Sequence, residues 1–533
     1  MADLADLVTR AAAEAPERAA LVEASGRALT WAELEDEVGR LATGLGAAGI
    51  VAGHRVLLAL GNRLEFVTTY LAILRAQAVA VPVNPRASVD ELARMLADSG
   101  SRLVVADAAT LPAVRAALAR VTQAQPASES ATESWREVLS RAASRIEVVA
   151  LDETPGPGER AFADLRAEQA RPVPPLPDPE KLAVLLYTAG TSGRPRAAML
   201  THRAMLANLE QVARVEPPMI RADDVVLAVL PLFHVYGLNA VLGGAVRHGA
   251  TVVLQERFDA QGTLDLVAAR GCTMVPLAPA VFRPWLALPD LRSRLSTVRL
   301  VLSGSAPLPR DVVEEFEERT GIPVHQGYGL TEAAPVVTST LCSAAHHPGS
   351  VGAALDGVGV RLVDERGVPV VGDDPGEIEI RGANLFSGYW PDGAEGPDDE
   401  GWWATGDVGF LDETGDLFLV DRLKELVVVS GFNVYPHEVE DVIRQTAGIT
   451  EAAVIGVADE DTGEAVVAYV VAPDLDPAAA EQTVRAACEV RLAGFKQPSR
   501  IEVVEALPMS VTGKVQKGRL RGLERRRALE LLE

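Results

Sequence analysis

Short apolar runs alternate with stretches of helical periodicity along the first third of the chain, and this alternation constrains the fold most. The runs VLLAL (56–60), AVAVPV (78–83) and LVVAD (103–107) each have the length of a strand. Helical spacing of apolar residues separates them, around residues 66–74 and again after Ser88. A strand–helix–strand rhythm predicts a parallel sheet covered by helices, and therefore an α/β fold.

The helix expected before these strands carries a motif that imitates a dinucleotide site. Thr30 and Glu33 have the spacing of a capping box, and apolar residues follow at helical spacing as far as Leu45. Residues 44–49 read GLGAAG and match G-x-G-x-x-G, which binds a dinucleotide only between a strand and the start of a helix. Here the glycines stand where a helix ends, so we exclude a dinucleotide site.

Changes in composition and in the pattern of expected strands and helices divide the chain into a large and a small domain. The segment 122–157 is rich in Ala, Ser and Glu and is typical of a surface insertion, and the proline-rich segment 172–179 is typical of a stiff connector. Apolar strands resume from Leu182, and short strands with Gly-rich turns follow Val351. We expect an N-terminal domain of residues 1–420, a C-terminal domain of residues 421–533 and a hinge at Asp421 and Arg422.

The net charge and the cysteine content of the chain disfavour nucleic-acid partners, disulfides and zinc sites. The 533 residues have a formal net charge of −24, which disfavours a sequence-independent contact with nucleic-acid backbones. The cysteines, Cys272, Cys342 and Cys488, lie far apart without a C-x-x-C pair, which disfavours disulfides and thiolate zinc sites. The first ten residues have acids where a signal peptide needs basic and apolar residues. We expect a cytoplasmic protein with no nucleic-acid partner.

One uncharged stretch, residues 225–246, is long enough to cross a bilayer. It contains Pro231, His234, Asn239 and two adjacent glycines, which predict a buried strand, a loop and a helix start instead. We therefore expect no transmembrane span and at most a transient contact with a membrane surface. The sequence assigns no oligomeric state.

The strongest local motif is Tyr187-Thr-Ala-Gly-Thr-Ser-Gly-Arg-Pro-Arg196, which directly follows the apolar strand LAVLLY. Glycines and small residues allow backbone N–H groups to approach an anion, and hydroxyl groups add donors and a possible metal ligand. No G-x-x-x-x-G-K-[ST] motif is present, so this is not a Walker loop. The composition after a buried strand indicates a polyphosphate site.

Two further motifs have side chains suited to a nucleotide. In Gly327-Tyr-Gly-Leu-Thr-Glu332 the aromatic ring can stack on a purine, and the carboxylate is a hard oxygen ligand for Mg²⁺. In Thr405-Gly-Asp407 the carboxylate can accept hydrogen bonds from ribose hydroxyls. Each motif alone is compatible with an ordinary turn. The occurrence of these motifs in one order along the chain is a much more specific indication of a nucleotide site.

With Asp421-Arg-Leu-Lys-Glu425 and Pro508-Met-Ser-Val-Thr-Gly-Lys514, these motifs resemble the acyl-adenylate-forming enzymes over nearly the whole chain. The run Ser430-Gly-Phe-Asn-Val-Tyr-Pro436 is most similar to that of bacterial medium- and long-chain fatty acyl-CoA ligases. The resemblance implies a large N-terminal domain with two βαβ-type sheets and a small β-barrel, followed by a small mobile α+β lid. It also implies ATP, Mg²⁺ and CoA, and an acyl-AMP intermediate that passes its acyl group to CoA.

The resemblance also assigns roles to residues. Nucleotide contacts are implied for Thr188, Ala189, Gly190, Thr191, Ser192, Gly193, Arg196, Gly304, Ser305, Ala306, Pro307, Gly327, Tyr328, Gly329, Thr331, Asp407 and Arg422. Mg²⁺ ligands are implied at Thr188 and Glu332, and CoA contacts at Ser430, Gly431, Phe432 and Asn433. Catalytic roles are implied for Lys514, Glu332 and His234, the last beside the acyl carboxylate. The acyl-pocket candidates are apolar residues near His234 and further on: Val235, Tyr236, Leu238, Met274 and Val275.

The motifs depart from the family pattern at the phosphate loop. Arg196 stands where lysine is usual and Ala197 where glycine is usual. Arginine keeps the charge of lysine but changes the geometry of the hydrogen-bond donors. We expect this change to affect the reaction rate and the nucleotide affinity more than the type of reaction. The segment 391–400 is also short and acidic.

We expect a fatty acid as the substrate, and three rivals stay open. An aryl-CoA ligase is the nearest. A fatty acyl-AMP ligase would stop at the adenylate, but the insertion that limits lid rotation in that subfamily is not evident. A non-catalytic sensor of acyl-adenylate or acyl-CoA would explain the altered loop, but Lys514, Glu332 and Asp407 are retained.

Overall fold

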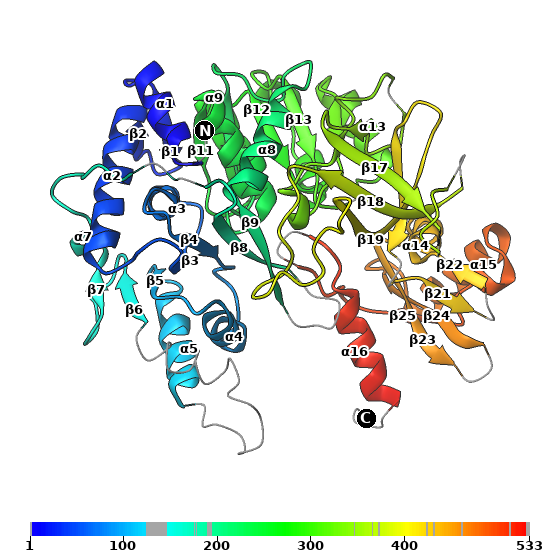
Figure 1. The fold of residues 1–533 in the computed structure, drawn as a ribbon. Helices are drawn as coiled ribbons and strands as arrows, with labels where there is room; N and C mark the ends of the chain where they lie inside the picture. The colour runs from blue at the N-terminus through cyan, green and yellow to red at the C-terminus, as the bar shows by residue number, and fades with distance from the viewer. Residues whose placement is uncertain are drawn as a thin grey trace.

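The computed structural model describes residues 3–528 except for short stretches, and Figure 1 shows their arrangement. The stretches outside the description are 124–145, 175, 177, 189–194, 307, 346, 365, 371–373, 423–424, 430–431, 460–461 and 511–512. For residues 122, 123, 421, 422, 428, 432, 433, 463, 525, 526 and 528 only the backbone is described.

A seven-stranded sheet confirms the parallel sheet predicted from the first third of the chain. Its strand order is β7-β6-β5-β3-β4-β8-β9, and only the pair β8–β9 is antiparallel. The strands are β3 (Arg55–Ala59), β4 (Val79–Pro82), β5 (Leu103–Ala106), β6 (Glu147–Ala150), β7 (Arg160–Ala161), β8 (Leu182–Thr188) and β9 (Arg196–Thr201). The connecting helices are α3 (Leu64–Arg75), α4 (Val89–Ser99), α5 (Leu111–Gln123) and α7 (Phe162–Leu165). Strand β6 lies inside the segment expected to be a surface insertion, and that expectation is wrong there because the EVVA run is mostly buried.

A second seven-stranded sheet combines the start of the chain with its middle third. Its order is β14-β13-β12-β10-β11-β1-β2, parallel except for the pair β1–β2. The strands are β1 (Ala19–Glu23), β2 (Ala28–Thr30), β10 (Val225–Ala228), β11 (Thr251–Leu254), β12 (Met274–Leu277), β13 (Leu300–Ser303) and β14 (Val324–Gln326). The helices of this part are α1 (Asp6–Glu14), α2 (Trp31–Ala47), α8 (His202–Ala213), α9 (Gly244–His248), α10 (Ala260–Arg270), α11 (Phe282–Leu286), α12 (Leu291–Arg294) and α13 (Arg310–Thr320).

The predicted start of α2 is confirmed. The hydroxyl of Thr30 accepts the N–H of Glu33 at 3.2 Å, and the Glu33 carboxylate accepts the N–H of Thr30 at 2.8 Å. Gly44 and Gly46 belong to the last turns of this helix. The GLGAAG run is therefore the end of a helix, as expected, and not a dinucleotide site.

Two smaller antiparallel sheets and a C-terminal unit complete the fold. The first two sheets are β15 (Thr338–Ser339) with β16 (Ala353–Ala354), and β17 (Val358–Val363), β18 (Gly376–Gly382), β19 (Trp402–Leu411) and β20 (Leu417–Arg422). The four-stranded sheet is open among the described residues and stands where a small barrel was expected. The C-terminal unit, yellow to red in Figure 1, has five strands: β21 (Val427–Val429), β22 (Phe432–Val434), β23 (Glu451–Asp459), β24 (Gly463–Val471) and β25 (Arg500–Val503). Its helices are α14 (Pro436–Arg444), α15 (Pro477–Arg491) and α16 (Lys517–Ala528).

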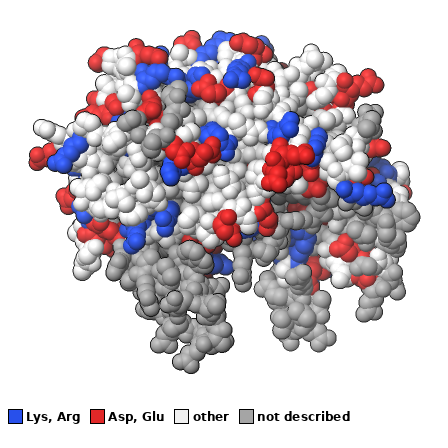
Figure 2. Space-filling model, viewed as in Figure 1, with Lys and Arg blue, Asp and Glu red and all other residues white. Residues whose placement is uncertain are grey.

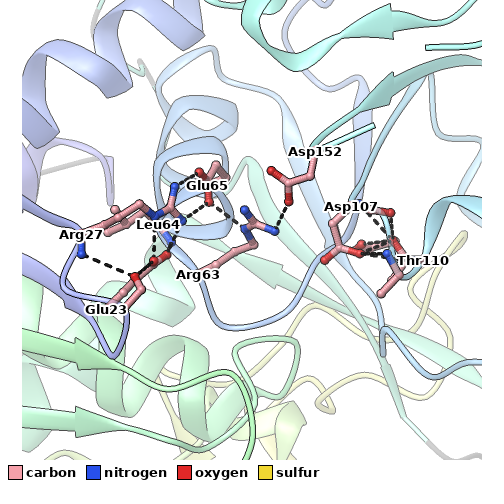
Figure 3. Close-up of polar contacts among 11 residues, drawn as sticks. Glu23, Arg27, Arg63, Leu64, Glu65, Asp107, Thr110 and Asp152 are labelled. Carbon is pink, nitrogen blue, oxygen red and sulfur yellow. Dashed lines mark hydrogen bonds and ion pairs between the residues drawn. The ribbon is translucent and has the colours of Figure 1, made fainter. Parts of the chain in front are cut away.

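The two large sheets share one hydrophobic core and are also joined by a network of charges. Leu21 and Val226 of one sheet and Val56 of the other belong to the same buried cluster. Figure 3 shows Glu23, at the end of β1, accepting hydrogen bonds from Arg27 and from the N–H of Leu64. Leu64 is the first residue of α3, so this carboxylate caps a helix that belongs to the other sheet.

The uncharged stretch 225–246 takes the form that the sequence predicts. It forms β10, a loop, the π-helix η1 (Tyr236–Gly243) and the start of α9. None of the helices in the described part of the chain combines the length and the apolar character needed to cross a membrane. Figure 2 shows acidic and basic side chains interspersed over the face that it draws.

Candidate active site

Described residues of most of the sequence motifs, though none of the run 430–436, line one large cavity of about 1940 Å³ between the N-terminal part of the chain and the C-terminal unit. The residues of the predicted site that line it are Thr188, Arg196, His234, Val235, Tyr236, Met274, Gly304, Ser305, Gly327, Tyr328, Gly329, Thr331, Glu332, Asp407 and Lys514. Ala306 is not among the lining residues, and Pro307 and residues 189–193 lie outside the described residues.

Thr188 and Arg196 face each other across the base of a hairpin. They are register partners in the antiparallel pair β8–β9 and stand at the two ends of the predicted phosphate loop, of which residues 189–194 lie outside the described residues. The Arg196 guanidinium donates to the carboxylate of Glu395 at 2.7 Å and lies over the ring of Tyr389, 3.8 Å from its centroid. The side chain of Arg196 is 30% exposed. A charged, half-exposed guanidinium at the edge of a cavity is suited to bind phosphate oxygens.

Glu332 is a buried carboxylate at the cavity wall. It lies in the 3-10 helix η3 (Thr331–Ala333) and is 7% exposed. The hydroxyl of Tyr389 donates to its Oε1 at 2.7 Å. With the hydroxyl of Thr188 in the same cavity, this gives oxygen donors of the kind that Mg²⁺ prefers, so the residues present fit that ion.

Three buried asparagines hold the segment that follows Glu332. The side-chain amide of Asn208 donates to the carbonyl of Val336 at 2.8 Å, and its oxygen accepts the N–H of Val336 at 3.0 Å. Asn239 donates to the carbonyl of Ala334 at 2.7 Å, and Asn384 donates to the carbonyl of Ala333 at 2.8 Å. Sequence reasoning missed all three, because asparagine in a helix or loop carries no local signal of burial.

Tyr328 and Asp407 connect the second motif to the third. The phenol of Tyr328 donates to Oδ2 of Asp407 at 2.7 Å. Asp407 lies on β19 and its backbone pairs with that of Arg422 on β20, although the Arg422 side chain lies outside the description. Close by in the same cavity wall, the buried hydroxyl of Ser303 has no hydrogen-bond partner among the described residues. This wall therefore offers an aromatic ring, a carboxylate and a hydroxyl to a bound nucleoside.

His234 is held neutral with its proton directed away from the backbone. Burial lowers its pKa to about 4, and the charge of Lys514 acts in the same direction. Its Nδ1 accepts the N–H of Tyr236 at 3.3 Å, so the proton resides on Nε2. The loop before it is fixed by Asn62, whose side chain bonds the carbonyls of Ala228 and Leu230 and the N–H of Leu232.

An apolar wall lies beside His234. The acyl-pocket candidates Val235, Tyr236 and Met274 line the cavity, and a Cβ at Gly304 would lie 3.0 Å from the Tyr236 ring. Leu238 and Val275 do not border the cavity. Both are fully buried in hydrophobic clusters, because they point away from the cavity side of η1 and β12. Sequence reasoning missed Val212, Met219, Ile220 and Val241, which complete this wall from α8, a loop and η1.

Comparison with known proteins identifies the family. The sequence model of the AMP-binding enzymes matches residues 8–390, and that of the AMP-binding enzyme C-terminal domain matches residues 438–514. This chain belongs to the AMP-binding enzymes. It therefore has acyl-CoA or aryl-CoA ligase activity through an adenylate, with ATP and CoA as co-substrates.

Relatives of this AMP-binding enzyme span almost its whole length. It is 34% identical to 4-coumarate–CoA ligase 5 of Oryza sativa subsp. japonica, over 97% of this chain and 94% of that protein. It is 32% identical to the long-chain-fatty-acid–CoA ligase of Bacillus subtilis (strain 168), with the same coverage. Among solved structures, ATP-bound MatB from Rhodopseudomonas palustris superposes with a TM-score of 0.85 at 31% identity, covering 97% of this chain and 98% of that one.

The C-terminal unit of this AMP-binding enzyme places Lys514 at the cavity. Lys514 follows a tight turn in which its N–H donates to the Ser510 hydroxyl at 3.0 Å. Gly513 has φ +77°, and a Cβ there would lie 2.9 Å from that of Ala280 in η2 (Pro279–Val281). Glycine is therefore required where this turn contacts the N-terminal part. Of the predicted CoA contacts, Phe432 and Asn433 lie on β22, and Ser430 and Gly431 lie outside the described residues.

Proposed function

We propose that this AMP-binding enzyme activates a medium- or long-chain fatty acid and transfers it to CoA. The observation that carries the proposal is the apolar wall beside His234. Five aliphatic side chains contribute to it from four separate segments, namely Val212, Met219, Ile220, Val241 and Met274. All five line the cavity, so an alkyl chain that enters it leaves water for apolar surroundings and gains hydrophobic free energy.

The two steps would use different parts of the cavity. In the first, an oxygen of the substrate carboxylate attacks the α-phosphorus of ATP and pyrophosphate leaves. Lys514 would offset the charge that grows on the phosphoryl oxygens, and Arg196 would bind the outer phosphates. In the second, the CoA thiolate attacks the acyl carbonyl and AMP leaves. His234, neutral with its proton on Nε2, would donate a hydrogen bond at the acyl carboxylate in the first step.

We propose that a turn of the C-terminal unit about Asp421 and Arg422 separates the two steps. β20 ends at Arg422 and β21 begins at Val427, so few residues connect the four-stranded sheet to the C-terminal sheet. Movement of a lid on such a connection can present Lys514 first and the segment 430–433 afterwards.

An aromatic acid is the second candidate substrate. The ring of Tyr236 lies against the backbone at Gly304 and gives the cavity one flat wall that could stack on an aryl group. The relatives include a 4-coumarate–CoA ligase as well as a fatty-acid ligase.

A panel of acids tests the assignment. With straight-chain acids of graded length, each added methylene should raise kcat/KM about fourfold until the wall ends, because burial contributes roughly 0.8 kcal/mol per methylene. Formation of AMP and acyl-CoA from ATP, CoA and each acid is the measurement, with benzoate- and cinnamate-like acids as the comparison set. Preference for the aromatic set over every straight chain would overturn the fatty-acid assignment and leave the ligase assignment intact.

A further inference from the structure

Tyr389 touches two residues of the proposed site with two different parts of one side chain. Its hydroxyl donates to Oε1 of Glu332 at 2.7 Å, and its ring lies under the guanidinium of Arg196 at 3.8 Å from the centroid. Neither contact was expected from the sequence, in which the residue stands in an ordinary Gly-Tyr-Trp run.

The hydroxyl of Tyr389 donates its hydrogen bond to a carboxylate that is itself buried in the cavity wall. A neutral phenol that donates to a carboxylate forms a charge-assisted hydrogen bond, which is stronger than a neutral one and fixes the rotation of the carboxylate.

The backbone around Tyr389 is held independently of these contacts. Its N–H donates to the carbonyl of Ala394 at 2.9 Å, and the neighbouring Trp390 donates to the carbonyl of Ala197 at 2.9 Å. The ring packs edge-on against Phe386, with 5.0 Å between centroids. Removal of the hydroxyl alone should therefore leave the fold in place.

We propose that Tyr389 is a positioning residue that orients the Glu332 carboxylate toward a magnesium ion through its hydroxyl and the Arg196 guanidinium toward the nucleotide phosphates through its ring. The proposal rests on the nucleotide site described under the proposed function. It adds that the metal side and the phosphate side of this site are coupled through one side chain. Arg196, unlike lysine, presents a planar cation that can stack on the ring while its N–H groups point elsewhere.

Two substitutions separate the two contacts. Tyr389→Phe removes the hydroxyl and keeps the ring, so the gain in ATP affinity on adding Mg²⁺ should shrink by about ten- to a hundredfold, as expected for a hydrogen bond to a charged group. Affinity for ATP without Mg²⁺ should stay unchanged. Tyr389→Leu also removes the ring, so ATP affinity without Mg²⁺ should fall by about two- to fivefold. Calorimetric titration of the full-length protein with ATP, with and without Mg²⁺, measures both.

A matched control and a kinetic measurement complete the test. Tyr70→Phe removes a phenol that is buried in α3 and does not line the cavity, and it should bind ATP as the wild type does in both titrations. In single turnovers Tyr389→Phe should slow acyl-AMP formation but not thioester formation from supplied acyl-AMP. A wild-type Mg²⁺ response in Tyr389→Phe, an equal loss in both titrations, or failure of that variant to fold would overturn the proposal. A wild type that forms no acyl-AMP would overturn the proposed function instead.

Discussion

The guanidinium of Arg196 has a donor geometry that the ammonium group of a lysine lacks. The guanidinium donates to Glu395 while its face lies on Tyr389, an arrangement that an ammonium group cannot reproduce. Glu395 comes from the acidic segment 391–400, so that segment and the altered phosphate loop meet in the structure. Two departures from the family pattern, the arginine at position 196 and the short acidic segment 391–400, therefore contact each other in the structure.

Arg196→Ala should weaken the use of ATP far more than the use of acyl-AMP. Loss of a charge-assisted contact costs about 1.5–3 kcal/mol, or roughly one to two decades in kcat/KM for ATP. Arg196→Lys should recover most of this loss, because the charge returns without the stacking. Steady-state kinetics in ATP, beside thioester formation from supplied acyl-AMP, are the measurement. Arg310→Ala is the control, since Arg310 forms an exposed ion pair with Glu314. An Arg196→Ala variant with unchanged ATP kinetics would mean that Arg196 is an ordinary surface charge.

The residues that a motif contains were predictable, and those that support the motif from elsewhere were not. Thr188, Tyr328, Glu332, Asp407 and Lys514 line one cavity, as their order along the chain indicates. Tyr389 and the asparagines that hold residues 333–336 act through contacts between segments far apart in sequence. No local pattern marks such residues. Leu238 and Val275 were misplaced for a related reason, because apolar character near His234 does not say which side of an element faces a cavity.

Among the elements, the positions of strands and of helix starts could be predicted from the sequence more closely than the type of helix, α or π. The capping box at Thr30 places the start of α2 where the sequence predicts it. The segment after His234 was expected only to begin a helix, and it forms the eight-residue π-helix η1. A π-helix is wider than an α-helix and is found often at functional sites. Its form depends on packing against α8 and β10, which a single sequence does not reveal.

Glu65 at the start of α3 forms ion pairs with Arg27 of the β1–β2 turn and with Arg63. These ion pairs predict that the free energy of unfolding decreases in acid. Burial would raise the pKa of Glu65, but hydrogen bonds from Arg27 and Arg63 outweigh it and lower the pKa to about 2. A carboxylate with a lowered pKa stabilises the fold above its ordinary value of 4.5, and this contribution is lost as the pH falls toward 2. The contact in Figure 3 should therefore contribute at neutral pH and disappear in acid.

Glu65→Gln tests that contribution. At pH 7 it should destabilise the protein by about 1–2 kcal/mol after solvent screening, and the difference from wild type should shrink steadily below pH 4.5. Thermal and urea unfolding at pH 7, 4.5 and 3 give the comparison. Glu314→Gln, at an exposed ion pair, should have no measurable effect at any of these values. A pH-independent difference for Glu65→Gln would show that packing, and not charge, holds this contact.

At the scale of the whole molecule, the C-terminal unit contributes Met509, Ser510, Lys514 and the start of α16 to the cavity wall. Gly513 contacts Ala280, and Lys514 lowers the pKa of His234 by its charge, so the turn is docked against the N-terminal part. Sequence analysis predicts a small C-terminal domain and a hinge near Asp421. It does not predict this docked position, because the contact joins residues more than two hundred positions apart and depends on a glycine that has no Cβ.

Separate measurement of the two half-reactions in Lys514→Ala tests most directly the proposal that the lid takes a different position in each step. Lys514 at the cavity is assigned to the adenylation step alone, so its removal should slow acyl-AMP formation from ATP and acid by about 200- to 1000-fold, as for a lost oxyanion donor worth roughly 3–4 kcal/mol. Supplied with acyl-AMP and CoA, the same variant should form thioester at close to the wild-type rate. Lys181→Ala, at an exposed lysine that does not line the cavity, should leave both steps unchanged. Single-turnover kinetics of each step decide the matter, and an equal loss of both steps in Lys514→Ala would contradict the two-position lid and require one fixed active site.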